Sequence, residues 1–228
     1  MPLGDSQCLA LVERGATRHP LDRALLLAAV AEAGVDWADR PLGQRNARLL
    51  ALRCEWFGPW FDAVLACQAC AKLLSLHVDL RAIGERAVAD DSPVSAGGAS
   101  FRRPTTRDLA ALVGQPDIAS ATSALLRRLA LGEPGAHWTD AERSALDGSL
   151  DDADPLAHIA LEVDCEHCAC RFTTPLDIGA SLWDELAAQA ERVIDDVHVL
   201  AAAYSWSEAE ILAMSTARRA LYKQRAGA

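Results

Sequence analysis

The sequence predicts an α+β protein that is mostly helical and has a central, split ribbon made of two β-hairpins. Two observations lead to this fold class. Two Cys-x-x-Cys turns, Cys67–Cys70 and Cys165–Cys168, are each followed by a strand-like run. Apolar residues at helical spacing occupy most of the chain before, between and after these turns. Helices that are segregated from antiparallel hairpins are typical of the α+β class.

The two cysteine turns look like one unit written twice. Leu73–Leu80 follows the first turn and Arg171–Ile178 follows the second. In both copies an aspartate, Asp79 or Asp177, lies twelve residues after the first cysteine and an aliphatic residue comes next. The repetition indicates two equivalent hairpins.

These turns are suited to binding one metal ion together. A single Cys-x-x-Cys turn presents only two thiolates, whereas Zn²⁺ prefers four soft ligands in a tetrahedron. We therefore expect the turns to meet around one structural zinc ion, although 94 residues separate Cys70 from Cys165. The predicted ligands are Cys67, Cys70, Cys165 and Cys168. Four protein ligands leave no open coordination position, so the ion would hold the fold together without taking part in chemistry.

Other interpretations of the cysteines stay open at this point. A redox Cys-x-x-Cys motif favours a helix N-terminus in a thioredoxin-like βαβ unit, and buried thiols also occur without any metal. Neither alternative accounts for the duplication. Within the second turn, Cys170 or His167 could replace one of the four predicted ligands.

The composition limits the partners and the compartment. The formal charge of −10 and the pI of about 5.0 argue against a surface that grips phosphate backbones, because nucleic-acid affinity comes mostly from Lys and Arg. Seven cysteines, an odd number, fit a reducing cytoplasm better than a disulfide framework. Met1–Asp5 has no basic region followed by an apolar one, so no signal peptide is expected. The longest uncharged apolar run, Ala24–Ala31, is too short to span a bilayer, and we expect a soluble, cytoplasmic protein without membrane insertion.

The predicted elements form one composite domain with five consecutive regions. They are an N-terminal helical region at 1–64, a first cysteine hairpin at 65–104, a helical insertion at 105–156, a second cysteine hairpin at 157–178 and a C-terminal helical region at 179–228.

Two helices are predicted before the first cysteine turn. The first covers Pro20–Gly34, because proline favours the first turn of a helix and glycine favours its end. The second covers Gln44–Phe57 and is followed by a Gly-Pro pair that stops it. Its arginines are expected on the solvated face: Arg45, Arg48 and Arg53.

The strands around the cysteine turns are less clearly marked. Gly84–Ser100 is rich in Asp, Ser, Pro and Gly, so it is expected to be an exposed loop. Phe101–Pro104 is then expected to be a short strand that completes the first hairpin. Ile159–Val163 supplies the strand that leads into the second turn.

Three helices are predicted in the insertion. Thr105 or Thr106 has the character of an N-cap for Asp108–Val113. The other two helices cover Ile118–Leu131 and Thr139–Leu150, the latter opening with a capping-box pattern. The aspartates that follow are expected in a solvated turn: Asp151, Asp152 and Asp154.

The C-terminal region has the clearest helical pattern. One apolar stripe predicts a long helix over Ile178–Tyr204. A short helix with a capping box of Ser207 and Glu210 follows, and a last helix begins at Ser215 or Thr216.

Trp183 and Trp206 are the candidate partner-binding residues. The stripe on the long helix is longer than a small ribbon can cover, and tryptophan is enriched among residues that anchor protein interfaces. The alternative is that both side chains belong to the core.

Nothing in the sequence favours an enzyme. There is no P-loop, no His-Glu-x-x-His motif and no Gly-rich dinucleotide turn. No nucleophile, base and orienting acid fall into a recognisable motif. We expect no small-molecule substrate.

Several segments together resemble a known family. They are Arg23–Ala28, Leu42–Leu50, the two cysteine turns, Phe101–Thr105, Phe172–Ile178, Leu182-Trp183 and Ala203–Leu212. They resemble the baseplate-protein family encoded with phage tails and phage-tail-like contractile injection systems, which is similar to the T-even phage baseplate hub and hub-assembly chaperone proteins. That family has glycine directly after each cysteine turn, where this chain has Ala71 and Ala169.

The resemblance implies a non-catalytic structural or chaperone-like role in assembling a baseplate. The implied partners are baseplate, hub or other tail components, and the implied location is the cytoplasm or an assembled tail-like particle. The alternative is a zinc-ribbon protein that binds nucleic acid or regulates its use, because ribbons of this kind often bind DNA or RNA. That alternative requires a basic, aromatic-rich face.

Overall fold

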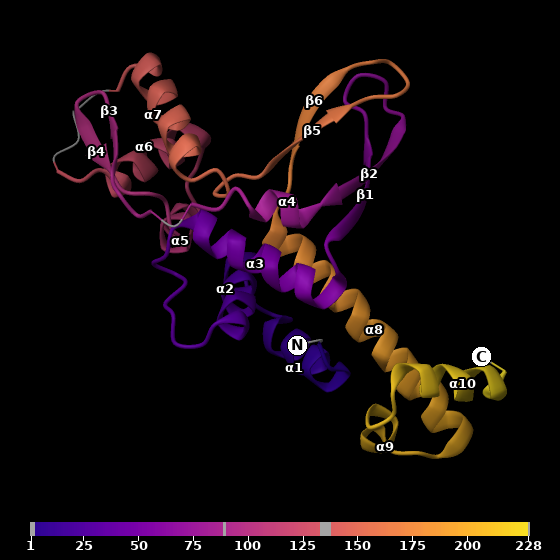
Figure 1. The fold of residues 1–228 in the computed structure, drawn as a ribbon. Helices are drawn as coiled ribbons and strands as arrows, with labels where there is room; N and C mark the ends of the chain where they lie inside the picture. Colours follow the sequence, from indigo (N-terminus) through magenta and orange to yellow (C-terminus); the bar gives the residue numbers. More distant parts are fainter. Residues whose placement is uncertain (1–2, 89, 133–137, 228) are drawn as a thin grey trace. The chain divides into compact units, whose positions relative to one another are not determined.

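The computed structural model describes residues 3–88, 90–132 and 138–227 (Figure 1). It confirms a mostly helical α+β fold with short antiparallel hairpins and one cluster of four cysteines. Several predicted segments extend in part beyond the described residues: Met1–Asp5, Gly84–Ser100 and the regions 1–64, 65–104, 105–156 and 179–228.

The elements follow one another in this order along the described chain. The helices are α1 (Asp5–Gly15), α2 (Pro20–Ala31), α3 (Leu42–Phe57), α4 (Leu80–Gly84), α5 (Thr106–Leu112), α6 (Ile118–Leu129), α7 (Asp140–Ala153), α8 (Ile178–Tyr204), α9 (Glu208–Leu212) and α10 (Thr216–Ala226). The strands are β1 (Trp60–Ala66), β2 (Leu73–Asp79), β3 (Val94–Ala96), β4 (Ala99–Phe101), β5 (Ala160–Asp164) and β6 (Arg171–Pro175).

The chain divides into two compact units, which differs from the single composite domain that the sequence predicts. The helical unit comprises Met1–His19 and Ser181–Ala228, and the hairpin unit comprises Pro20–Ala180. The first turn of α8 therefore belongs to the hairpin unit and the rest of that helix to the helical unit.

The helical unit is built along the apolar stripe of α8. Leu182, Leu186, Val193 and Leu200 are buried, which confirms the periodicity of the predicted helix. The N-terminal helix α1 packs against α8, and the thiol of Cys8 donates a hydrogen bond to the carbonyl of Leu186 over 3.5 Å.

Helices α9 and α10 are stabilised by a capping box and by a buried arginine. The predicted capping box of Ser207 and Glu210 is present at α9. Arg219 on α10 has no exposed surface, and it forms ion pairs with Asp5 and Asp196. Arg219 therefore connects α10 to both α1 and α8.

In the hairpin unit, two of the predicted solvated arginines are buried, so that prediction is wrong. Arg45 is 6 % exposed and Arg53 is 3 % exposed. Arg45 donates to the Thr106 hydroxyl over 2.8 Å, and Arg53 donates to the carbonyls of Gly58 and Trp60. Burial lowers the pKa of Arg45. A buried guanidinium requires such acceptors, and Arg45 has a further one within α3, the Oδ1 atom of Asn46.

The insertion has its own small hydrophobic core. This core includes residues from Val94 onward, whereas the insertion was predicted to begin at residue 105. Val94–Ala96 and Ala99–Phe101 form a hairpin through a Gly-Gly turn with positive φ at both glycines, at positions expected to be an exposed loop. Phe101 pairs with Val94, so the prediction that Phe101–Pro104 completes the first cysteine hairpin is wrong. The buried residues of this core are Val94, Ala96, Phe101, Leu129 and Leu146.

The helices of the insertion begin where their caps predict. Thr105 caps α5 through a capping box with Asp108, and Thr139 caps α7 through one with Glu142. Helix α7 continues through Asp151 and Asp152 to Ala153. The predicted solvated turn is therefore wrong, because Asp151 and Asp152 are exposed but helical and Asp154 is only 2 % exposed.

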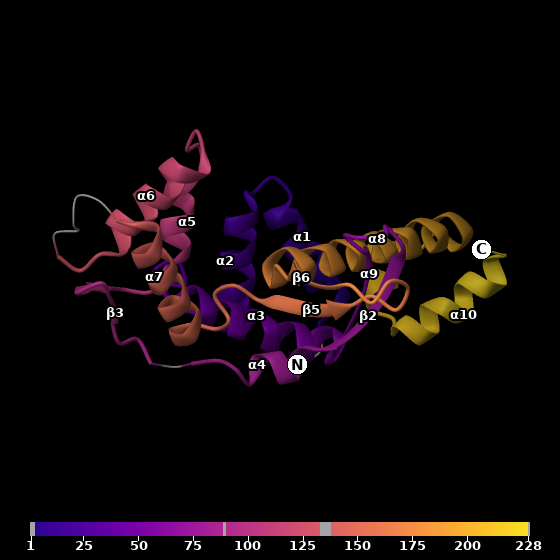
Figure 2. The ribbon, with the colours of Figure 1, turned by 90° about the horizontal axis from the view of Figure 1, so that it is seen from above.

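Within the hairpin unit, the insertion elements lie together at one end of α3, away from the two cysteine hairpins (Figures 1 and 2). None of the helices in the described ranges is both long enough and apolar enough to cross a membrane.

Candidate metal centre

Two hairpins with the same register carry the cysteine turns. β1 pairs with β2, and β5 pairs with β6. Ala66 lies opposite Leu73 in the first hairpin, and Asp164 lies opposite Arg171 in the second. In each pair the first residue directly precedes the first cysteine of its turn, and the second lies three residues after the last cysteine. The first hairpin is therefore completed by Trp60–Ala66, a strand that the sequence analysis missed.

The turns themselves repeat the same backbone geometry. The N–H of Ala71 donates to the carbonyl of Cys67 over 2.9 Å, and the N–H of Ala169 donates to the carbonyl of Cys165 over 2.9 Å. Both alanines have a φ of 57°, in the left-handed region that favours glycine. The duplication seen in the sequence is thus a duplication of structure.

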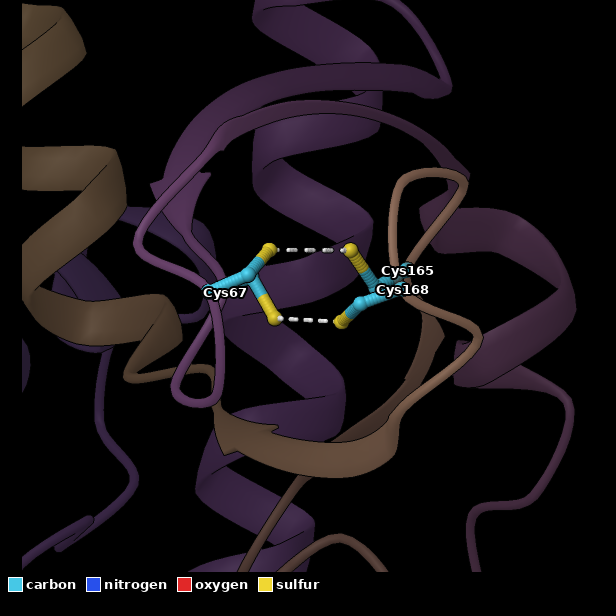
Figure 3. Close-up of side chains that lie close together, drawn as sticks. Cys67, Cys165 and Cys168 are labelled. Carbon is cyan, nitrogen blue, oxygen red and sulfur yellow. Dashed lines mark hydrogen bonds between the residues drawn. The ribbon is translucent and has the colours of Figure 1, made fainter.

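The turns bring the four predicted cysteines together. The Sγ atoms of Cys67 and Cys168 are 3.7 Å apart, and those of Cys70 and Cys165 are 3.7 Å apart. All four sulfur atoms lie within 4.8 Å of one another. Figure 3 shows the sulfur atoms of Cys165 and Cys168 facing those of the first turn, with the contacts running across the gap between the hairpins.

These distances fit a tetrahedral thiolate site. A Zn–S bond of about 2.3 Å gives a tetrahedron with S–S edges of about 3.8 Å, close to the observed 3.7 Å. A disulfide requires an S–S distance of about 2.05 Å, and all seven cysteines are free. Four thiolates suit a soft or borderline ion and leave no position for a substrate.

The thiols do not share one protonation state in the metal-free cluster. Backbone N–H groups of Cys70 and Ala69 lower the pKa of Cys67 to about 6. The backbone N–H of Cys170 also lowers the pKa of Cys168, but the thiols of Cys165 and Cys70 outweigh it and raise that pKa to about 12. A metal ion must therefore displace protons when it binds, so its affinity falls as the pH falls.

A small apolar cluster surrounds the sulfur atoms on the facing sides of the hairpins. Cys67, Leu74, Val163 and Cys165 are buried, and Leu65, Leu76 and Phe172 pack on them. The alternative ligands lie outside the four-sulfur group: His167 is exposed, and the thiol of Cys170 points to the carbonyl of Arg171 at 3.7 Å.

The repeated aspartate of each copy has a defined role. Asp79 accepts from the backbone N–H of Arg81 over 2.9 Å at the start of α4. Asp177 accepts from the backbone N–H of Ala180 over 3.0 Å at the start of α8. Each hairpin is therefore followed directly by a helix whose N-terminus is capped by the repeated aspartate. Aspartate is a preferred N-cap residue, so the sequence itself contains this signal.

The structure places the two candidate tryptophans differently. Trp183 is buried, and its ring lies against Gly15, where an added Cβ would come within 2.2 Å of it. Trp183 is therefore a core residue and not a surface anchor. Trp206 is half-buried, with its ring stacked on Tyr204 at 4.5 Å and edge-on to Tyr222 at 4.8 Å.

The outer faces of the two hairpins differ, although their registers match. The first exposes Trp60, Val64 and Leu73, which are 51 %, 68 % and 70 % exposed. The second exposes Glu162, Asp164 and Arg171. The face of the first hairpin also carries the exposed ion pair of Asp62 and His77, so it differs from an ordinary polar sheet face by its three large exposed apolar side chains. Comparison of the chain with family models, with curated proteins and with solved structures found no match.

Proposed function

We propose that this chain is a non-catalytic structural or assembly protein for the baseplate of a phage tail or contractile injection system, held together by a structural zinc ion on Cys67, Cys70, Cys165 and Cys168. The observation that carries the proposal is the closed group of four sulfur atoms between two equivalent hairpins. A site with four protein ligands fixes the fold and leaves none of the open positions that catalysis needs.

The zinc ion would act on folding. Its ligands would come from two hairpins whose facing sides also share a small apolar cluster. Structural zinc sites contribute apparent binding free energies of about 10–16 kcal/mol in zinc-finger peptides. The bound ion would therefore hold the two hairpins together and keep the orientation of their exposed faces constant.

The baseplate role draws support from where the family-like segments lie. Leu42–Leu50 forms the first turns of α3 and holds the insertion: Asn46 donates to the carbonyl of Leu156 over 2.7 Å, and Gly43 donates to Asp154. Ala203–Leu212 contains the capping box of α9. Both segments stabilise the packing or the start of helices, which supports a structural role.

The exposed apolar side chains of the first hairpin, Trp60, Val64 and Leu73, favour protein partners over nucleic acid. An exposed apolar group on a rigid element is typical of protein-binding surfaces. The second hairpin exposes two carboxylates, Glu162 and Asp164, where a nucleic-acid ribbon needs cations.

Co-purification from cells that carry the native gene neighbourhood tests this function. Tagged protein should retain sheath, tube or hub components and contain one zinc ion per chain. Val64→Thr with Leu73→Thr should abolish retention of those components. Glu162→Thr with Arg171→Thr, at the equivalent positions of the second hairpin, should leave it intact. Salt-sensitive retention of DNA, with no tail component, would instead support the nucleic-acid alternative and overturn the proposal.

A further inference from the structure

The helical unit contains a groove that the proposed function does not use. The groove has a volume of about 640 Å³ and lies between α1 and α9. Its apolar lining comes from the two helices alike: Leu9, Ala10, Ala209, Leu212 and Ala213. Leu9 and Leu212 are only half-buried there, so the groove has apolar surface left to cover.

Two glutamates give this groove an acidic rim. Glu13 lies on α1 and Glu208 lies on α9, and both are exposed. Among the described residues, no Lys or Arg pairs with either carboxylate within 4.0 Å. An occupant with an apolar side chain between two cations would complement the groove in both respects.

Helix α10 carries an apolar side chain between two cations. Leu221 is 54 % exposed, and Arg218 and Arg225 are exposed at spacings of three and four residues from it. At that spacing the three side chains share one face of the helix. The opposite face is fixed within its own unit, because Arg219 and Lys223 pair with Asp196.

We propose that α10 of a second copy docks in this groove, with Leu221 on the apolar floor and Arg218 and Arg225 against Glu13 and Glu208. Both surfaces are formed without rearrangement, so the copies can associate largely as rigid bodies. The contact is small and its ion pairs are exposed, so the association is weak and sensitive to salt. This inference does not depend on the metal site or on the baseplate role.

Sedimentation velocity of the full-length, zinc-loaded protein tests the docking. The mass should rise from 24.4 kDa towards that of a dimer as the concentration increases. Glu13→Lys with Glu208→Lys, and separately Arg218→Glu with Arg225→Glu, should each raise the dimer Kd by about tenfold or more, a change of about 1.4 kcal/mol. Combining all four substitutions restores opposite charges and should return the Kd to near the wild-type value.

A matched control separates docking from net charge. Glu191→Lys with Asp184→Lys changes two exposed carboxylates on α8 that do not line the groove, so it matches the charge change of Glu13→Lys with Glu208→Lys and should leave the Kd unchanged. Circular dichroism and thermal melts show whether each variant folds. A wild-type protein that stays monomeric at every concentration would overturn the proposal, as would a dimer that tolerates both double reversals or fails to recover in the fourfold variant.

Discussion

Gly43 donates its backbone N–H to the carboxylate of Asp154 over 3.0 Å, and both residues are buried. The contact joins the first turn of α3 to the residue that ends α7, across 111 positions of sequence. Because a Cβ at Gly43 would lie 1.6 Å from Asp154 Oδ1, only glycine allows this approach.

Gly43→Ala should therefore destabilise the protein by about 2–4 kcal/mol, since it combines overpacking with a weakened buried hydrogen bond. Urea denaturation measures the change. Gly148→Ala in α7 is the control, because its new Cβ would meet no atom within 4 Å. That control should stabilise the helix by up to about 1 kcal/mol. Equal effects of the two substitutions would contradict the steric account.

Removal of one metal ligand should separate the hairpins from the rest of the fold. Cys67→Ser should lose stoichiometric zinc, and amide hydrogen exchange in β1, β2, β5 and β6 should become faster. Exchange in the insertion core should change little, because that core has its own buried residues. Mass spectrometry reads the metal content and the exchange rates.

Cys170→Ser is the matched control for the ligand variant. Its thiol lies two residues beyond the second cysteine turn and outside the group of four sulfur atoms. It should keep one zinc ion per chain and the wild-type exchange rates. Loss of zinc from this variant, with retention in Cys67→Ser, would mean that the ligand set is wrong.

Asp108 should make the hairpin unit sensitive to acid. Burial alone would raise the pKa of Asp108, but hydrogen bonds from Arg102, Thr105 and Arg128 hold it well below its usual range. The folded state therefore favours the carboxylate, and this stability is present above pH of about 4 and is lost as the pH falls further. Asp108→Asn should cost about 1.5–3 kcal/mol at neutral pH, because it removes the buried charged acceptor of the hydrogen bonds from Arg102, Thr105 and Arg128.

The acid dependence provides the check on Asp108. Unfolding free energies of wild type and Asp108→Asn should converge gradually as the pH falls from about 4 through the lowered pKa of the folded-state carboxylate, because Asp108 is neutral in both states only below that pKa. Asp39→Asn is the comparison, because Asp39 pairs with Arg107 at the surface. That variant should change stability by less than about 1 kcal/mol. A constant gap between wild type and Asp108→Asn at all pH values would exclude the proposed linkage.

The two left-handed alanines should respond alike to glycine. Ala71→Gly and Ala169→Gly each relieve about 1–2 kcal/mol of backbone strain. They also give up about 0.4–1 kcal/mol through the more flexible unfolded chain, so each should be neutral or stabilising by up to about 1 kcal/mol. Ala63→Gly in β1 should destabilise instead. Thermal melts of the zinc-loaded proteins measure these changes, and unequal effects at positions 71 and 169 would argue against equivalent turns.

The parts of the fold that depend on short spacings could be predicted from the sequence. The capping boxes at Thr105, Thr139 and Ser207 each join residues three positions apart. The cluster of four cysteines could be predicted because the duplication marks both of its halves. In each case the interacting residues carry their own local signal.

The buried polar contacts could not be predicted in the same way. Arg45 finds Thr106 at a distance of 61 positions, and nothing near Arg45 distinguishes it from a surface arginine. The strand Trp60–Ala66 was missed because its mixed apolar pattern directly follows a Gly-Pro stop. By contrast, the Gly97-Gly98 pair was an available hairpin signal, masked by the polar composition around it.

The spacing of the cysteine turns also affects how the protein is made. A ribosome adds about 5–20 residues per second, so Cys67 and Cys70 emerge roughly 5–20 s before Cys165 and Cys168 can complete the shell. During synthesis the nascent chain therefore carries a two-thiolate half-site that holds an ion weakly, if at all, while the insertion can already build its own core. Under the proposed function, zinc capture would thus be a late event, and a cell short of zinc would accumulate chains with a finished insertion and unjoined hairpins.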